Sequence, residues 1–277
     1  MLTSVRSLLA ATLLTSACLA AAPAMAQDAI EPPGAVTASG SVALVSDYRF
    51  RGVSQTDEEM AVQGGFAVSH ESGLYAGTWA SNLAGWGTFG GSNMELDLYA
   101  GYVVPLGAAS LDVGLTWYMY PGGADTTDFA EPYVKLSSTL GPVEGLVGVA
   151  YAPEQEALGN FSAHPESDGQ GHDNLYIWTD LNSGIPTTPV TVKGHLGYSN
   201  GNPGLGPNGT SIAPTGEYFD WMLGADYALG PLTLGVAYVD TDISREDSAY
   251  LLPNFSSTKD GGSIADAQVV FSVSAGF

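Results

Sequence analysis

His195 and Ser199, in the stretch GHLGYSNG, are the residues of this chain whose types best suit nucleophilic catalysis. A serine nucleophile needs its base within hydrogen-bond reach, about 2.6 to 3.2 Å from the hydroxyl oxygen. On one extended strand the two residues share a face, but four strand residues separate them by about 13 Å. We therefore predict that the chain is not an enzyme.

Acidic residues also gather after the stretch VAYVD, at Asp240, Asp242, Glu246 and Asp247, and carboxylates are the ligands that divalent cations prefer. The stretch lacks the glycine and terminal glutamate spacing of an EF-hand loop. The four histidines are scattered and show no transition-metal spacing. We predict no cofactor and favour a solvated acidic loop; Ca²⁺ or Mg²⁺ bridging to lipopolysaccharide is the weaker interpretation of these four acids.

Most other charged residues recur at every second position of extended stretches, so they share one face of each stretch. Twelve of them are our candidates for lining a lumen and filtering charge: Asp47, Arg49, Arg51, Glu95, Asp97, Asp112, Glu131, Lys135, Asp180, Lys193, Asp220 and Asp226. Glu144 and Asp266 fall on the same face. The acids outnumber the bases there, so the lumen should concentrate cations and repel anions.

We predict that Arg49 and Arg51 beside Asp47 form part of the constriction or its charge filter, because two adjacent inward guanidinium groups must be hydrated or paired. The alternative is that the lumen charges pair across strands and plug the interior. About twelve strands favour a narrow aqueous path, between the filled interior of eight-stranded barrels and the wide channels of sixteen-stranded ones.

These charges require strands to position them, and period-two alternation predicts about twelve. The predicted strands run over residues 42–53, 61–69, 74–82, 94–104, 109–120, 129–138, 143–151, 174–181, 190–199, 218–228, 232–241 and 266–277. Their second face is apolar and free of charge, which suits lipid, because an Arg or Lys at mid-bilayer costs about 2 to 4 kcal/mol. Aromatic residues expected in interfacial girdles near strand ends are Tyr48, Phe50, Trp117, Phe219, Tyr227, Tyr238 and Phe277.

The connections alternate between short turns, such as HESG and ALGP, and long, mostly acidic loops. A meander through a bilayer requires this alternation. The sequence therefore predicts an all-β fold: a single transmembrane antiparallel β-barrel of about 12 strands, with short periplasmic turns and long acidic extracellular loops. A soluble β-sandwich or lipocalin-like barrel is the alternative, and its usual short loops fit less well.

The first 26 residues have the layout of a secretory signal peptide, with Arg6, an apolar core and an A-x-A site at Ala24 to Ala26. A lipidated Cys18 is the alternative interpretation. We expect residues 27–40 to be a short N-terminal periplasmic segment and residues 41–277 to be the barrel. The chain has 29 acidic residues against 7 basic ones, which argues against nucleic-acid binding.

The segment VVFSVSAGF places Val269, Phe271, Val273, Ala275 and Phe277 on one side of the last strand. In an outer-membrane barrel lipid covers that side, and the strand closes the barrel by pairing with the first.

The stretch SDYRFRG, followed by QGG, GLYAG and the E-x-D of Glu95 and Asp97, resembles the TorF porin family, also described as the Gcw_chp conserved family. The resemblance rests on specific motifs in the first strands. In the rest of the mature chain only the general pattern is similar. It implies an outer-membrane barrel of Gram-negative bacteria, and its terminal Phe277 resembles the signal recognised by barrel assembly machinery. It supplies no ligand-binding residues.

These observations together predict a passive diffusion channel for small polar solutes, with modest cation preference. The runner-up is a closed barrel that binds a surface partner through its acidic loops or stabilises the membrane. A soluble binding barrel ranks third. The expected partners are outer-membrane lipid and lipopolysaccharide, the assembly machinery, small polar solutes and further copies of this chain.

Overall fold

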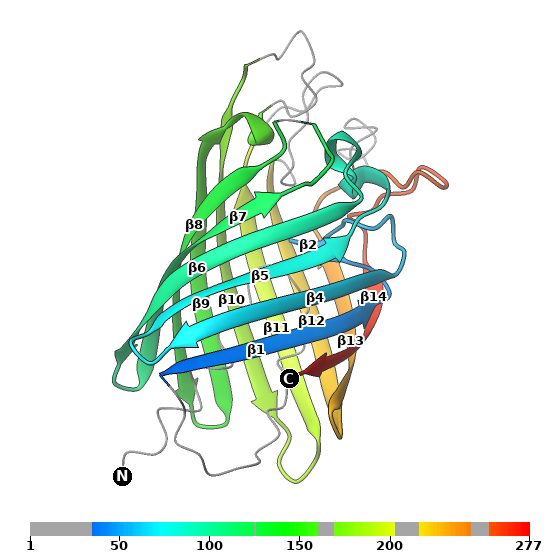
Figure 1. Cartoon of the computed structure of the whole chain (residues 1–277). Coiled ribbons are helices and arrows are strands. Elements are labelled where there is room, and N and C mark those ends of the chain that lie inside the picture. The colour runs from blue at the N-terminus through cyan, green and yellow to red at the C-terminus, as the bar shows by residue number, and fades with distance from the viewer. Residues whose placement is uncertain (1–34, 125, 160–168, 203–215, 245–254) are drawn as a thin grey trace.

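The chain forms a closed antiparallel β-barrel (Figure 1). A computed structural model describes residues 35–124, 126–159, 169–202, 216–244 and 255–277. Within these residues the barrel strands are β1 (Val36–Val45), β4 (Ala61–His70), β5 (Leu74–Asn82), β6 (Met94–Leu106), β7 (Ala109–Met119), β8 (Phe129–Leu140), β9 (Val143–Gln155), β10 (His172–Gly184), β11 (Val190–Asn200), β12 (Glu217–Leu229), β13 (Leu232–Thr241) and β14 (Gln268–Gly276). Twelve strands confirm the predicted fold class.

Pairing follows chain order, and β14 pairs with β1 to close the barrel, as predicted. Ser41 lies opposite Gly276 and Val45 opposite Ser272 in that seam. The described part contains three single-turn 3₁₀ segments, Gly85–Gly87, Phe89–Gly91 and Glu156–Leu158. No helix in it has the length and apolarity to cross a membrane.

The barrel has two unlike ends. At the short-turn end, residues 71–73, 107–108, 141–142, 185–189 and 230–231 connect neighbouring strands. At the long-loop end, the connections are residues 46–60, 83–93, 120–128, 156–171, 201–216 and 242–267. Figure 1 shows the C-terminus on the side of the short turns, with the described parts of the longer connections toward the opposite end.

Along each strand an exposed apolar side chain alternates with a buried side chain that is often polar. Leu223 is 69% exposed and Val113 is 46% exposed, whereas Glu95 and Asp220 are 1% and 3% exposed. A soluble protein buries the apolar set and exposes the charges. The reversed arrangement places lipid outside and polar groups in the lumen, which is the pattern of a membrane barrel.

The predicted first strand, residues 42–53, is wrong at both ends. The strand begins at Val36, so residues 36–40 belong to the barrel wall, and it ends at Val45. Residues 46–60, which we call the inward segment, then leave the wall and form a small hairpin of β2 (Arg49–Phe50) and β3 (Val53–Ser54). The hairpin turn is Arg51-Gly52, and both residues have positive φ, at 49° and 82°. Two such residues make the tight turn that joins antiparallel strands, so the chain reverses here.

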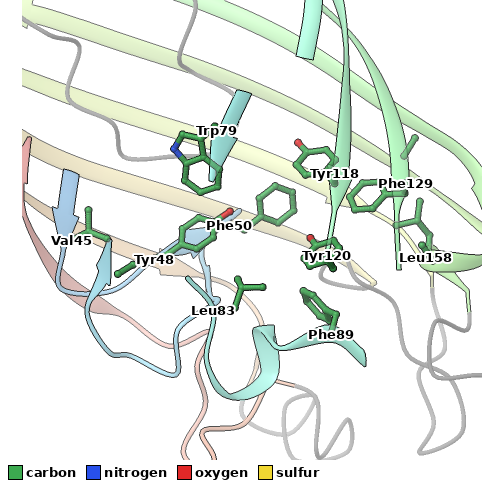
Figure 2. Close-up of a cluster of buried hydrophobic side chains, with 13 residues drawn as sticks. Val45, Tyr48, Phe50, Trp79, Leu83, Phe89, Tyr118, Tyr120, Phe129 and Leu158 are labelled. Carbon is green, nitrogen blue, oxygen red and sulfur yellow. The ribbon is translucent and has the colours of Figure 1, made fainter. Parts of the chain in front are cut away.

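The girdle prediction is wrong for Tyr48 and Phe50, because the inward segment carries both into the barrel. They are 1% and 6% exposed and belong to a buried hydrophobic cluster that includes Trp79, Tyr118 and Phe129 (Figure 2). Tyr118 and Phe129 stack with their ring centres 4.5 Å apart. The cluster therefore lies inside the barrel and narrows the lumen at this height. The other five predicted girdle aromatics are exposed: Trp117, Phe219, Tyr227, Tyr238 and Phe277.

Candidate functional site: the barrel lumen

All twelve predicted lumen residues lie inside the barrel, although three of them lie off the wall. Asp47, Arg49 and Arg51 are on the inward segment. The remaining nine come from β6, β7, β8, β10, β11 and β12: Glu95, Asp97, Asp112, Glu131, Lys135, Asp180, Lys193, Asp220 and Asp226. Of the two others on the predicted charged face, Glu144 is exposed at the short-turn end, and Asp266 precedes β14. The role of the twelve lumen residues as a charge filter stays a prediction.

Arg51 spans the lumen from the hairpin turn to the opposite wall. Its guanidinium donates to Glu131 Oε1 on β8 and to Asn174 Oδ1 on β10, each at 2.5 Å. Its charge also lies 4.2 Å from the centre of the Tyr176 ring. The Tyr218 hydroxyl on β12 donates to the Arg51 carbonyl oxygen at 3.1 Å. One residue thus ties the inward segment to three wall strands.

Arg49 holds the hairpin in its own shape. Its Nε donates to Asp47 Oδ2 at 2.7 Å, and its Nη1 donates to the carbonyl oxygens of Gly52 and Asp266 at 2.9 and 2.8 Å. The Ser54 hydroxyl donates to the other oxygen of Asp47 at 2.5 Å. The adjacent inward arginines are therefore paired with acids, and pairing is one of the two ways, beside hydration, in which a buried guanidinium can be stabilised.

Two lysines neutralise acids further along the lumen. Lys193 Nζ lies 2.8 Å from Asp226 Oδ1, and Lys135 Nζ lies 3.6 Å from Asp112 Oδ2. Lys135 Nζ is also 4.0 Å from the centre of the Tyr133 ring, so its ammonium lies between a carboxylate and an aromatic face.

His195 is held between two carboxylates rather than beside Ser199. Its Nδ1 lies 2.6 Å from Asp180 Oδ1 and its Nε2 lies 3.1 Å from Asp220 Oδ1. The Tyr176 hydroxyl contacts both Nε2 and Asp220. Ser199 is fully buried and lies within 3.5 Å of the Asn174 amide nitrogen. The histidine is thus engaged by acids and does not contact the serine hydroxyl.

Glu95 and Asp97 differ from the other lumen acids. Both are buried, at 1% and 3% exposure, and face the lumen two residues apart on β6. The Tyr48 hydroxyl lies 3.0 and 3.1 Å from the two oxygens of Glu95. Asp97 Oδ1 has no hydrogen-bond partner. In the described part of the chain, no Lys, Arg or His forms an ion pair with either acid.

The inward segment also docks on the last long loop. The Thr258 backbone N–H donates to Asp57 Oδ1 at 2.9 Å, its hydroxyl donates to the other oxygen, and Lys259 Nζ donates to the Asp57 carbonyl oxygen. Burial raises the pKa of Asp57, but the hydrogen bonds from Thr258 and Ser257 outweigh it and leave that pKa below its ordinary value. The ionised form of Asp57 therefore stabilises this contact.

Sequence reasoning missed the lumen aromatics that lie over glycines of neighbouring strands. A Cβ at Gly114 would lie 2.5 Å from the hydroxyl oxygen of Tyr133, and one at Gly101 would lie 2.3 Å from that of Tyr75. The Tyr75 and Tyr133 hydroxyls are 2.5 Å apart. The available signal was a glycine at a lumen position directly across from a lumen tyrosine on the next strand.

The loop acids considered for a divalent cation are only partly described. Asp240 accepts from the Tyr238 hydroxyl at 2.8 Å, and Asp242 accepts from the Phe219 N–H at 2.7 Å. Glu246 and Asp247 lie outside the described residues, as does the predicted signal peptide. Among the residues that are described, no group of three or more His, Cys, Asp or Glu side chains is arranged to hold a metal ion.

The barrel is similar in fold to solved porin structures. The NanC porin matches with a TM-score of 0.52 and 11% identity, over 87% of this chain and 99% of that one. Another porin structure covers 87% of this chain and 100% of its own, with 12% identity and a TM-score of 0.41. OmpF of Salmonella typhi, solved in complex with daunomycin, covers 87% and 97%, with 10% identity and a TM-score of 0.41.

The fold is thus that of a porin-type barrel. No curated protein sequence matches the chain significantly. The model of the Gcw_chp family, described as bacterial protein of unknown function, matches residues 29–277, and the chain belongs to this family. The family resemblance seen in the sequence is confirmed under that name, and the TorF name stays a prediction.

Proposed function

We propose that this protein is a narrow outer-membrane channel for small polar solutes and ions, with a modest preference for cations. The observation that carries the proposal is the inward orientation of the charged residues, with acids in excess over bases, behind an apolar outer face. Unpaired carboxylates attract cations and repel anions over the length of a narrow lumen. Export by a Sec-type signal peptide and residence in the outer membrane form part of this proposal.

Arg49 and Arg51 with Asp47 form the proposed constriction, since the inward segment brings all three into the lumen at the long-loop end. The two arginines are buried, at 5% and 8% exposure, and Arg51 reaches Glu131 on the far wall. Any solute that crosses at this height must pass the pair or displace the hairpin.

The second candidate is a closed barrel that acts through its acidic loops or as a membrane scaffold. The inward segment and the aromatic cluster around Phe50 favour it, because together they occupy the lumen (Figure 2). The ion pairs of Arg51, Lys135 and Lys193 favour it as well, since a paired charge needs less water.

Conductance of the refolded chain in a planar bilayer, under a KCl gradient, separates the two candidates. Discrete steps with a cation-selective reversal potential support the channel. Silence from protein that keeps its heat-modifiable gel mobility supports the closed barrel, because that mobility reports the folded barrel in detergent.

The paired substitution Arg49→Ala and Arg51→Ala tests the constriction. We expect larger steps and a shift of the reversal potential toward stronger cation selectivity, because two positive charges leave the narrowest part. Unchanged conductance and reversal potential in folded protein would remove Arg49 and Arg51 from the constriction. Arg49→Lys with Arg51→Lys is the matched control that keeps the charge.

Three partner interactions complete the proposal. Lipid and lipopolysaccharide would cover the exposed apolar face, and the assembly machinery would recognise Phe277, whose side chain is accessible at 80% residue exposure. Contacts between copies of the chain would use part of the same apolar face. Cross-linking in native membranes tests the last of these.

A further inference from the structure

The described barrel wall carries six buried carboxylates, and four of them lie beside a basic side chain of the chain itself. Asp112, Glu131, Asp220 and Asp226 lie within 4 Å of Lys135, Arg51, His195 and Lys193, respectively. Glu95 and Asp97 are the exceptions among the described residues. Glu95 has only the Tyr48 hydroxyl, and the buried Oδ1 of Asp97 has no hydrogen-bond partner.

Two such groups cannot remain both ionised and without a counter-charge at low energy. A buried carboxylate without donors carries a desolvation cost of several kcal/mol. Two residues apart on one strand, the two groups are about 7 Å apart at their Cα atoms and repel each other when both are charged. When ionised, both groups are acceptors only, so the partners that they lack are N–H or O–H donors.

Aromatic rings flank the free acid. Trp79 on β5 and Tyr118 on β7 are the register partners of Asp97 on its two sides. Tyr48, which binds Glu95, packs edge-on against Trp79 with ring centres 5.3 Å apart. Aromatic faces and carboxylates together favour a cation, and an organic one above a strongly hydrated one.

The same lumen contains an ammonium group in a comparable setting. Lys135 Nζ lies 3.6 Å from Asp112 Oδ2 and 4.0 Å from the centre of the Tyr133 ring. At Glu95 and Asp97 the carboxylates and rings are present, and the chain supplies no ammonium from its described residues.

We propose that Glu95 and Asp97 bind the primary ammonium group of a small organic cation. Its three N–H groups match the free oxygen of Asp97 and the oxygens of Glu95, and the rings of Trp79 and Tyr118 receive its charge. The site deepens the proposed function, because it names the class of cation that the lumen selects. It also rests on that function, because the cation would reach the site through the proposed channel.

Methylammonium chloride is the probe. The thermal unfolding midpoint of the refolded full chain in detergent is measured against its concentration, with NaCl added to keep the ionic strength constant. A ligand of the folded state raises this midpoint saturably. We expect saturation in the wild-type chain, and at least a tenfold weaker affinity in Asp97→Asn. Glu144→Gln, which removes one exposed lumen-side acid at the short-turn end, should bind as the wild type does.

Several outcomes overturn the site. They are the absence of a methylammonium-dependent shift, an equal shift in Asp97→Asn, or a weakened shift in Glu144→Gln. An equal response to tetramethylammonium, which has no N–H group, would show that donation to Asp97 is not the basis of binding. An equal response to KCl would assign the site to an inorganic cation.

Protonation of Glu95 or Asp97 is the competing way to neutralise the pair. Infrared spectroscopy of the wild-type protein tests it, and this test needs no variant. An infrared carbonyl band of a protonated acid in wild-type protein at neutral pH that persists in saturating methylammonium overturns the proposal. If Asp97→Asn fails to fold, Glu95→Gln replaces it with the same expected loss.

The site and the channel fail in different ways. Saturable methylammonium binding by a barrel that is silent in a bilayer keeps the site and removes the channel. Cation-selective steps without methylammonium binding keep the channel and remove the site.

Discussion

The barrel wall and the inward segment have the same alternation of residue types but opposite surroundings. In β1 the alternate positions separate lipid from lumen, so Leu44 is 47% exposed. In residues 46–60 the alternation continues through Tyr48 and Phe50, and yet both of these are buried inside the barrel. A period of two therefore identifies extended backbone and does not identify what lies on either side of it.

The largest expected effect in this comparison comes from Arg51→Met, on the inward segment. It leaves Glu131 buried without its cation, which should lower the free energy of unfolding by about 3 to 5 kcal/mol. Urea titration in lipid vesicles measures it. The double substitution with Glu131→Gln should recover most of the loss, and a double variant as unstable as the single one would contradict the pairing.

A charge on the outer face of the wall should have the next largest effect. Leu115→Arg places a guanidinium near the middle of β7 on the lipid side and should cost about 2 to 4 kcal/mol in the same titration. Leu140→Arg, at the short-turn end of β8, is the control and should cost about 0 to 1 kcal/mol. Equal costs at the two positions would mean that lipid does not cover the middle of this face.

Packing on the inner face of the wall should have a smaller effect. Gly114→Ala brings a methyl group against the Tyr133 ring and should destabilise the barrel by about 1 to 3 kcal/mol. Gly194→Ala on β11 is the control, because a Cβ there meets its nearest atom at 4.0 Å. Loss of stability in both variants alike would point to the backbone rather than to the tyrosine.

The smallest effect concerns the contact of the inward segment with residues 257–259. Because the folded pKa of Asp57 is lowered, its contribution of about 1 kcal/mol is complete above the ordinary pKa of 3.8 and is lost as pH falls through the folded value. The amide protection factor of this segment, which is the intrinsic exchange rate at a given pH divided by the observed rate, should therefore fall in acid.

Asp57→Asn should abolish that acid dependence. Burial and nearby Asp47 raise the pKa of Glu58 despite Arg49, so its contribution has the opposite sign and weakens as pH rises. Glu58→Gln should therefore leave the fall of the protection factor in acid intact. The same acid profile in the Asp57→Asn protein would place the sensitive group elsewhere.

Much of the wall is predictable from the sequence, because lipid imposes a rule on every strand. The alternation and the short turns predict twelve strands, the closure of β14 on β1 and the inward side of residues such as Asp220. The first strand was the failure, since the alternation runs on through Arg51-Gly52, where the chain reverses. Gly52 suits the positive φ of a tight turn, but Arg51 is not a residue that such turns favour, so the local sequence carries only half of the usual turn signal.

The pairing of the lumen charges was not predictable to the same degree. Asp112 and Lys135 are direct cross-strand neighbours, so the strand register would have suggested them. Arg51 and Glu131 are 80 residues apart and meet only because the hairpin crosses the lumen.

The sequence by itself determined which residues of the wall strands face outward and which face the lumen, because each choice there depends on a residue's own polarity and on a period of two. The tertiary structure alone decided which lumen charges meet one another and which, like Asp97, meet no opposite charge among the described residues. Those contacts depend on the closure of the barrel and on the inward turn of residues 46–60, which bring distant segments together at distances that no local pattern encodes.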